Sequence, residues 1–272
     1  MQPAYYLLFL PIVFLFGAAI GSFLNVVILR LHSSKTLGGR SECPNCHHTL
    51  AAIDLIPILS YILLVGRCRY CGHKLSSQYP VVEFLTAACF TFVFLVNGQI
   101  LIQSLNILNL TSFVFNLFVV SVLIVITVYD LKWGLIPDKI VIPASIVAFI
   151  FQLVFNLFII FNYQLLILNL AVAFGIALFF FLIIWLTRGR GMGGGDFKLS
   201  IFIGLSLGWP LALVATFLGF LTGALGAVML ILLGKKSFKQ TVPFGPFLAL
   251  GSLLAIVYGK WILELYLKSM GL

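Results

Sequence analysis

Two aspartates lie at the edges of long apolar runs, where a carboxylate is costly unless it faces protein or water. Asp130 follows the uncharged, mainly apolar run 113–129, and Asp196 lies just before another apolar run. Two carboxylates within hydrogen-bonding reach cannot easily both ionise, so such a pair holds one shared proton. That state suits aspartic-protease chemistry, because the ionised partner takes a proton from water while the protonated partner donates to the scissile carbonyl oxygen.

A glycine-rich stretch leads directly into the second aspartate. Residues 188–198 read RGRGMGGGDFK, with five glycines between positions 189 and 195. A stretch without Cβ atoms can adopt positive φ and allows another backbone to approach closely. We therefore expect Gly193 and Gly195 to make room for an extended substrate peptide, or to form a hinge that closes over it.

Two charged neighbours complete the predicted cleft. Lys198 lies two residues after Asp196 and is expected to bias the ionisation of that carboxylate. Asp138 follows Ile136-Pro137 and is expected chiefly to open the next helix as an N-terminal cap. Support of the cleft is its second expected role.

The residues alone leave other functions open. A membrane-edge aspartate often caps a helix or pairs with a nearby lysine, here Lys132 or Lys198. Asp130 and Asp196 are also compatible with the proton or ion relay of a transporter. A glycine-rich loop can cradle phosphate, but no Gly-Lys-Ser/Thr of the Walker type follows this one. A membrane scaffold that docks partners through its cysteine-bearing region is the remaining alternative.

Four cysteines form two Cys-x-x-Cys pairs separated by 21 residues. They are Cys43, Cys46, Cys68 and Cys71. This spacing suits a tetrahedral Zn²⁺ site, and four protein ligands leave no open position, so the predicted site is structural. The alternatives are two disulfides, which a reducing compartment disfavours, or a ligand taken from His47, His48 or His73. Cys89 lies in an apolar run and is expected to be a small core residue.

The chain that carries these groups is very apolar. Of its 272 residues, 62% are hydrophobic and 8% are charged, with a mean hydropathy of +1.19, whereas a soluble domain has about 25% charged residues. We therefore predict an all-α polytopic membrane protein in contact with lipid. The net charge of +9 then marks cytoplasmic loops rather than nucleic-acid binding, and no nucleic-acid partner is expected.

Seven apolar stretches approach or exceed the roughly 20 residues that cross a hydrocarbon core of about 30 Å. They begin near Tyr5, Val81, Ser112, Ile140, Leu165, Leu211 and Phe244. An eighth run, Leu199–Leu207, is half as long and ends at the turn-like Gly208-Trp209-Pro210. We expect about eight transmembrane helices, this one short or tilted; a single kinked helix through 199–233 is the alternative. The first stretch lacks a basic start and predicts a retained helix rather than a cleaved signal.

The basic residues lie in alternate loops. With eight spans, four loops on one side hold all of the 16 Lys and Arg except Lys260 and Lys268. These loops carry Arg30, Lys35, Arg40, Arg67, Arg69, Lys74, Lys132, Lys139, Arg188, Arg190, Lys198, Lys235, Lys236 and Lys239. Because Lys and Arg resist translocation, this side is predicted to be cytoplasmic and both termini to lie outside.

Three segments are predicted on this basis. Residues 1–30 form a first transmembrane helix, 31–79 a small cytoplasmic four-cysteine zinc domain, and 80–272 the transmembrane aspartic protease core. A domain of about 50 residues buries too little surface to fold easily alone, so a metal would stabilise it. Within it, Leu55–Val65 is apolar but too short to span, and is expected to be a core element or to lie on the membrane.

The motifs also occur together in a known order. Residues 193–198 read GGGDFK, and Asp130 is followed by Ile136-Pro137-Asp138. The blocks GAAIGSFLNVVILRL (17–31), DLIPILSYILLVGRCRYCGHKLSSQYPVVEFLT (54–86) and VPFGPFLALG (242–251) accompany them. Over nearly its whole length the chain resembles the bacterial prepilin peptidases, also called type IV leader peptidases, which are polytopic aspartic proteases of the Gly-x-Gly-Asp type.

The resemblance implies a catalytic pair at Asp130 and Asp196. It implies prepilin and pseudopilin substrates, which carry a short basic leader, a glycine and a hydrophobic helix, cut after that glycine at the cytoplasmic face of the bacterial inner membrane. In this family the four-cysteine domain further implies N-methylation of the new amino terminus, with S-adenosylmethionine as the methyl donor. No binding motif for the donor can be recognised in the sequence, so this activity rests on the resemblance alone. Lys132 and Trp133 depart from the family, in which many members are acidic or polar there.

Overall fold

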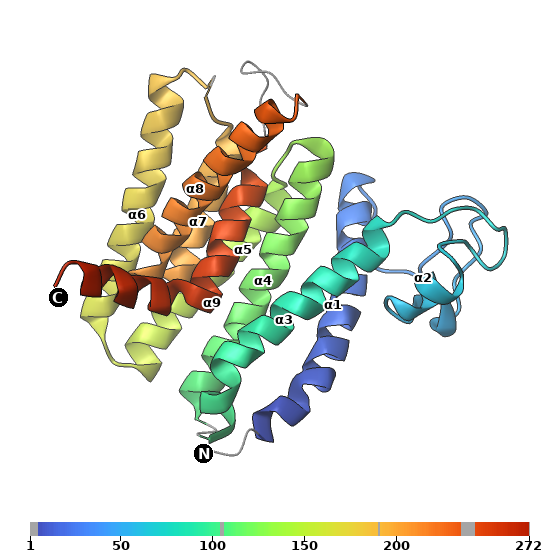
Figure 1. Cartoon of the computed structure of the whole chain (residues 1–272), viewed down its shortest axis with the longest axis horizontal. Coiled ribbons are helices and arrows are strands. Elements are labelled where there is room, and N and C mark those ends of the chain that lie inside the picture. The colour runs from blue at the N-terminus through green and yellow to red at the C-terminus, as the bar shows by residue number, and fades with distance from the viewer. Residues whose placement is uncertain (1–4, 104–105, 190, 235–242, 272) are drawn as a thin grey trace. The chain divides into compact units, whose positions relative to one another are not determined.

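The computed structural model describes residues 5–103, 106–189, 191–234 and 243–271, which are helical apart from loops and two isolated β-bridges (Figure 1). The elements are η1 (Tyr5–Phe9), α1 (Leu10–His32), η2 (Ala52–Leu55), α2 (Leu59–Leu63), α3 (Gln78–Gln103), α4 (Ile107–Trp133), α5 (Asp138–Val154), η3 (Phe155–Ile159), α6 (Tyr163–Leu186), α7 (Gly194–Leu207), α8 (Leu211–Leu232) and α9 (Gly245–Ser269). The predicted all-α class is confirmed.

The contacts divide the chain into two compact units, Met1–Val125 and Ile126–Leu272. The first unit contains α1, the cysteine-bearing insert, α3 and most of α4; the second contains the end of α4 and all later helices. Within the first unit α1 packs along α3. The predicted division of the chain after residues 30 and 79 stays a prediction.

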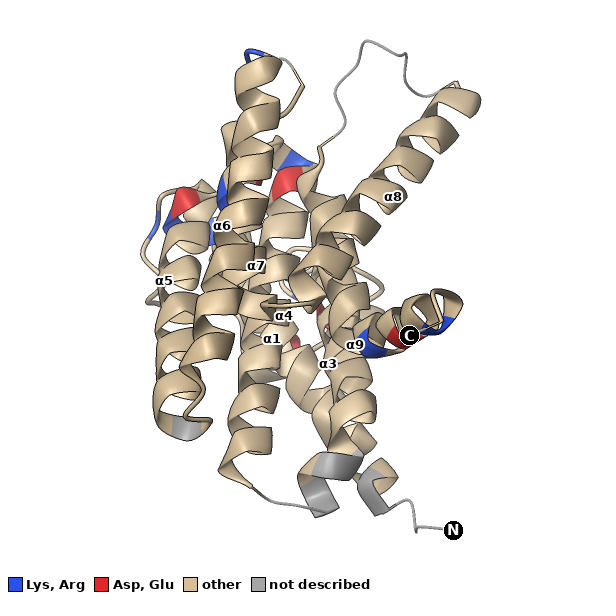
Figure 2. Ribbon diagram, turned by 90° about the vertical axis from the view of Figure 1, so that its left-hand side faces the viewer, with Lys and Arg blue, Asp and Glu red and all other residues tan. Residues whose placement is uncertain are grey.

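Seven helices in the described part of the chain are long and apolar enough to cross a membrane, namely α1, α3, α4, α5, α6, α8 and α9. The eighth, α7, has 14 residues and is therefore about 21 Å long, less than the thickness of the hydrocarbon core. It ends at Leu207, and α8 begins at Leu211, so two helices are confirmed and the single kinked helix is wrong. In Figure 2 the charged residues of the second unit gather toward helix ends.

The orientation stays a prediction. Arg190, Lys235, Lys236 and Lys239, on which it partly depends, lie outside the described residues. The apolar segment Leu55–Val65 contains no buried residue, and Leu59, Ile62 and Leu63 are exposed. A core role for this segment is therefore wrong, and contact with the membrane surface remains the prediction.

Small residues allow the membrane helices to approach closely. A Cβ atom at Gly17 or Gly21 of α1 would lie 2.7 Å from a backbone Cα of α3, at Ala87 and Glu83 respectively. A Cβ at Gly204 of α7 would lie 2.6 Å from Ala173 Cα in α6. The hydrophobic effect does not drive apolar helices together in lipid, because lipid tails are as apolar as the helices. Close backbone packing of this kind is therefore a main source of helix association in membranes.

A buried amide cluster satisfies the free backbone groups where the short helix α7 ends. Gln152 Nε2 donates to the Leu205 carbonyl at 3.0 Å, and Asn169 Oδ1 accepts from the Trp209 N–H at 2.9 Å. Asn169 Nδ2 also donates to Gln152 Oε1 at 3.0 Å, which joins α5 to α6. Unpaired backbone groups are very costly in the bilayer interior, and the cluster therefore allows α7 to stop short of the second membrane face.

Candidate functional site

Asp130 lies in the last turn of α4 and is 5% exposed. The helix ends at Trp133, and Gly134 takes a left-handed conformation with φ +65°. Its N–H donates to the Asp130 carbonyl at 2.8 Å. Glycine at this position is the common way to close a helix C-terminus, and it fixes where α4 presents its carboxylate.

A glycine from a distant helix holds that carboxylate. The backbone N–H of Gly245, the first residue of α9, hydrogen-bonds to the Asp130 side chain. A Cβ atom at Gly245 would lie 2.6 Å from Asp130 Oδ2, so any other residue would displace this carboxylate or the start of α9. A backbone N–H donor stabilises an ionised carboxylate, so Gly245 offsets part of the cost of a charge on the buried Asp130.

Asp196 lies in the first turn of α7. Its carboxylate accepts a hydrogen bond from the backbone N–H of Gly193, the N-cap residue, and its own N–H donates to the Gly193 carbonyl at 3.2 Å. A carboxylate that returns to the N-cap N–H is half of a capping box. The start of the helix thus fixes the Asp196 side chain. The second hydrogen bond of a capping box is missing, because Gly193 has no side chain to accept from the Asp196 N–H.

The two carboxylates influence each other's charge. Asp196 lies in α7, which is not one of the seven candidate spans. Burial raises the pKa of Asp196 to about 6, and the neighbouring Asp130 carboxylate adds to this effect. Within the described residues neither aspartate has a Lys, Arg or His nitrogen within 4.0 Å, which contradicts the lysine-partner alternative. Two interacting carboxylates titrate as a pair, so this pair can hold one proton between them.

Ile136 joins the backbones beside the two aspartates. A Cβ at Gly195 would lie 3.0 Å from Ile136 Cβ, and a Cβ at Gly245 would lie 3.4 Å from Ile136 Cδ1. The side chain of Ile136 therefore packs against both glycines, one next to each aspartate. The loop after α4 thereby fixes the start of α7 against the start of α9.

Lys198 pairs with Asp138 and not with Asp196. Its Nζ lies 2.6 Å from Asp138 Oδ1, and the two side chains are 40% and 55% exposed. Asp138 is the first residue of α5, whose N-cap position belongs to Pro137 and carries no side-chain cap bond. The predicted cap at Asp138 is wrong because the helix begins on this residue rather than after it.

The three glycines directly before Asp196 do not adopt the positive φ angles that favour glycine, and only Gly195 closely contacts another segment, at Ile136. Gly193 has φ −82°, and Gly194 and Gly195 are helical, so none of the three uses positive φ. Gly189 does, with φ +74°, and Arg190 lies outside the described residues. A Cβ at Gly194 would meet nothing within 4 Å. The peptide cleft beside these glycines stays a prediction.

The four cysteines of the two pairs come together at one point in the first unit. Their Sγ atoms all lie within 4.8 Å of one another, and Cys43 Sγ is 3.8 Å from Cys71 Sγ. Zn–S bonds of about 2.3 Å in a tetrahedron place the sulfurs about 3.8 Å apart. The geometry therefore fits a tetrahedral metal ion bound by Cys43, Cys46, Cys68 and Cys71.

The two cysteine pairs repeat one backbone design. Cys43 N–H donates to the His48 carbonyl at 3.0 Å, and Cys68 N–H donates to the His73 carbonyl at 2.9 Å. Burial opposes ionisation of Cys43, but the backbone N–H groups of Cys46 and Asn45 donate to its sulfur and lower its pKa to about 7. Metals bind the thiolate, so the loops prepare this sulfur as a ligand.

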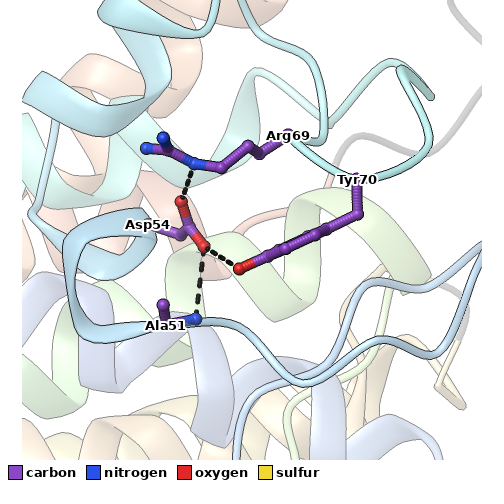
Figure 3. Close-up of polar contacts among 4 residues, drawn as sticks. All are labelled: Ala51, Asp54, Arg69 and Tyr70. Atoms are coloured by element: carbon purple, nitrogen blue, oxygen red, sulfur yellow. Dashed lines mark hydrogen bonds and ion pairs between the residues drawn. The ribbon is translucent and has the colours of Figure 1, made fainter.

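Asp54 ties the segment between the pairs to the second pair (Figure 3). Its carboxylate accepts from Arg69 Nε at 2.7 Å, from the Tyr70 hydroxyl at 3.0 Å and from the Ala51 N–H at 3.2 Å. The Tyr70 ring lies against the ring of His48, which follows the first pair, with centroids 3.8 Å apart and the planes tilted by 38°. The insert therefore has a polar cross-link in addition to the cysteine cluster.

The alternatives for the cysteines do not survive. All five cysteines are free in the structure, so the two disulfides are wrong. Among the described residues the metal-ligand cluster contains only cysteines, and no histidine replaces one. Cys89 is part of α3 and is only partly buried.

Sequence reasoning missed the two residues that build the aspartate site. Gly245 lies in the block VPFGPFLALG, which contributes to the family resemblance but to which no function was assigned. Ile136 was noted only as a neighbour of Asp138. Glycine directly before proline and directly after an aromatic residue was the available signal. The signal does not reveal which carboxylate Gly245 faces, because 114 residues lie between it and Asp130.

Two family models match the chain. The bacterial peptidase A24 N-terminal domain matches residues 15–97, and the type IV leader peptidase family matches residues 117–228. The first range contains the cysteine cluster, and the second contains both aspartates. Gly245 lies beyond both ranges.

Curated relatives match along almost the entire chain. A protein of Bacillus subtilis is 36% identical over 95% of this chain and 98% of its own length. Relatives from Aeromonas salmonicida and Pseudomonas putida are 32% and 30% identical, over 96% and 100% of this chain and 95% and 96% of their own lengths. All three are named prepilin leader peptidase/N-methyltransferase. No solved structure gives a significant match.

Proposed function

This chain belongs to the type IV leader peptidase family, and we propose that it is a multi-pass membrane enzyme that removes the leader of prepilins and N-methylates the new amino terminus. The names of the relatives support both activities, and none of them supports a transporter. The aspartate pair of the second unit supports the peptidase activity on physical grounds.

Asp130 and Asp196 are the catalytic pair of this proposal. The ionised member takes a proton from water, the water oxygen attacks the scissile carbonyl carbon, and the protonated member donates to the carbonyl oxygen. Collapse of the tetrahedral intermediate breaks the C–N bond, and the leaving amine takes up the proton that the first aspartate removed from water, while the carbonyl oxygen returns its proton to the second. Gly245 holds the Asp130 carboxylate through its N–H, and Ile136 sets the spacing of the two helix starts.

The substrates we propose are prepilins and pseudopilins, whose hydrophobic helix lies in the bilayer while a short basic leader remains in water. Cleavage follows the glycine between the two parts. Gly193 and Gly195 would border the extended peptide, with the Asp138–Lys198 pair beside them. The carboxylates would also attract the basic leader.

The insert is proposed to carry a structural Zn²⁺ on Cys43, Cys46, Cys68 and Cys71. Four thiolate ligands would fill the coordination shell and hold the two loops together. S-adenosylmethionine is proposed as the methyl donor, which supplies an electrophilic methyl group. We further propose that the insert and the aspartates face the cytoplasm and that both termini lie outside, as the distribution of Lys and Arg indicates.

The convergence of Asp130, Gly245 and Asp196 carries the peptidase proposal. The test is incubation of the purified full chain with a synthetic prepilin, with and without S-adenosylmethionine, followed by mass spectrometry. We expect loss of the leader in both samples and addition of one methyl group only with the donor. An intact prepilin after prolonged incubation with folded protein would contradict the proposal.

A further inference from the structure

The junction between α1 and α3 contains polar side chains that the cleavage chemistry does not use. We define the polar seam as Ser22, Asn25, Gln78 and Glu83. Asn25 is 2% exposed and Glu83 is 7% exposed. Ionisable and polar groups buried between membrane helices are costly and point to a functional site. The polar seam lies wholly within the first unit, apart from the aspartate pair in sequence and in contacts.

Glu83 is a buried carboxylate without a cation. Its Oε2 accepts from the Ile58 N–H at 2.7 Å, and the Ser22 hydroxyl also hydrogen-bonds to it. Across the residues that the structure describes, no Lys, Arg or His nitrogen lies within 4.0 Å of this carboxylate. In the same unit Glu42 is exposed and Asp54 pairs with Arg69. A carboxylate has about four acceptor sites, so Glu83 can still bind a positively charged donor.

A second acceptor, Gln78 Oε1, lies on α3, five residues before Glu83 and beside Asn25 of α1. Asn25 Oδ1 accepts from Gln78 Nε2 at 3.1 Å, and Asn25 Nδ2 donates to the Tyr79 carbonyl at 3.1 Å. Gln78 Oε1 is buried and has no hydrogen-bond partner. Ser22 and Asn25 are three residues apart and share a helix face. The polar seam therefore contains two acceptors, the Glu83 carboxylate and Gln78 Oε1, and the second is buried without a donor.

The backbone around Glu83 is constrained to keep this arrangement. Gly21 allows α1 to approach so closely that a Cβ there would lie 2.7 Å from Glu83 Cα. Ile58, whose N–H binds Glu83, has φ +63°, a rare and strained conformation for a β-branched residue. Strain of this kind persists where function requires it, and here it turns one N–H toward the carboxylate.

We propose that the polar seam binds the new α-amino group of the cleaved substrate and that Glu83 accepts its proton during methyl transfer. This inference rests on the proposed double activity. A primary ammonium has three N–H donors, enough for the Glu83 carboxylate and for a further acceptor such as Gln78 Oε1. The sulfonium centre that carries the methyl group has no N–H donor, so an ammonium group fits these acceptors better. The α-amino group of the methyl donor is the competing occupant, and a loss confined to KM for the donor would reveal it.

The chemistry balances with these groups. The α-ammonium gives one proton to the Glu83 carboxylate, and the nitrogen lone pair forms a bond to the methyl carbon of the sulfonium donor. The C–S bond breaks and its electron pair stays on sulfur, which leaves a neutral thioether and a methylated ammonium. Glu83 returns its proton to water before the next cycle.

The first test measures binding without any methyl donor. Full-length protein in detergent is titrated with two peptides that begin at the mature pilin terminus, one with a free amine and one N-acetylated. We expect the free amine to bind roughly tenfold more tightly, and Glu83→Gln to abolish that preference. Glutamine keeps an oxygen for the Ile58 N–H, and Glu42→Gln is the matched control, because it removes an exposed carboxylate of the same unit. An unchanged preference in Glu83→Gln would overturn the inference.

The second test separates the two activities. With a pre-cleaved pilin and S-adenosylmethionine, Glu83→Gln should lower kcat of methylation by about 100-fold or more, with KM for the donor and prepilin cleavage within about twofold of the parent. Wild-type methylation rates, or a loss confined to KM for the donor, would refute the role of Glu83. If the parent protein neither cleaves nor methylates, the proposed function itself fails.

Gln78→Met provides the second variant if Glu83→Gln does not fold. It removes the unpartnered oxygen and leaves the carboxylate in place. We expect the preference for the free amine to fall about threefold to tenfold. An undiminished preference would contradict the two-acceptor seam.

Discussion

The insert and the aspartate site hold their functional groups by different means. The insert has η2, the five-residue helix α2 and two isolated bridges as its only regular structure within the described residues 33–77, and its cysteine cluster and Asp54 connect the loops. The aspartates instead lie in the end turns of α4 and α7, which are positioned by the backbone of Gly245 and the side chain of Ile136. The insert should therefore be sensitive to removal of its cross-links, and the aspartate site to the addition of a single methyl group.

Metal removal should produce the largest effect, and it should be confined to the insert. Structural zinc contributes on the order of 10 kcal/mol to small cysteine-rich domains. We expect a chelator, or Cys43→Ser, to unfold residues 33–77 and abolish methylation while most prepilin cleavage remains. Protease sensitivity of the insert and a cleavage assay on the same sample measure both. Cys89→Ser is the control, and loss of cleavage in parallel with metal release would break the distinction between the regions.

A methyl group at Gly245 should have the next largest effect, now on the aspartate site. The added Cβ would lie 2.6 Å from Asp130 Oδ2, and displacement of a catalytic group by about 1 Å costs roughly 100-fold. We expect Gly245→Ala to lower kcat for cleavage by about that factor and to leave metal content unchanged. Gly194→Ala, whose Cβ meets nothing within 4 Å, should stay within about threefold of the parent.

These two regions also differ in how far the sequence predicts them. The cysteine cluster can be predicted from two Cys-x-x-Cys motifs, because the two cysteines of each motif are close in the sequence. The span positions follow from hydropathy, and the separation of α7 from α8 follows from Gly208-Trp209-Pro210. Gly245, Ile136 and the amide cluster around Gln152 depend on contacts between segments far apart in sequence, which no local pattern encodes. The cap expected at Asp138 failed by one residue, the usual precision of a helix boundary.

The pH dependence of cleavage should sharpen the account of the aspartate pair. Because the pKa of Asp196 is raised to about 6, the form with one shared proton gives way to the doubly charged pair above that pH. We expect kcat/KM for cleavage to fall about tenfold per pH unit on the alkaline side. A profile of kcat/KM in mixed buffers at constant ionic strength measures it. A flat profile between pH 5 and 8 would contradict a shared proton.

The polar cross-link of the insert should matter less than its metal. Burial of Asp54 opposes its charge, but Arg69, Tyr70 and the Ala51 N–H lower its pKa below the usual value. A carboxylate with a lowered pKa stabilises the fold above its unfolded pKa of about 3.9 and ceases to do so as pH falls below it. We expect Asp54→Asn to speed metal release to a chelator by roughly tenfold at pH 7, with cleavage unchanged. Glu42→Gln, an exposed carboxylate in the same insert, should leave the release rate as it was.

The Asp138–Lys198 pair should have the smallest effect. Both side chains are about half exposed, and pairs of this kind contribute about 0–1 kcal/mol. We expect Lys198→Met to change thermal stability little and cleavage by no more than about threefold at low salt. A loss comparable to that of Gly245→Ala would assign Lys198 a direct part in the chemistry.

The two aspartates themselves provide the most direct measurement. Asp130→Asn and Asp196→Asn keep the shape of each side chain while removing its charge, so each protein should retain its metal and its melting temperature. We expect each to lose prepilin cleavage by at least about 1,000-fold while it still methylates a pilin that was cleaved beforehand. Cleavage at the full rate by either asparagine variant would contradict the shared-proton mechanism.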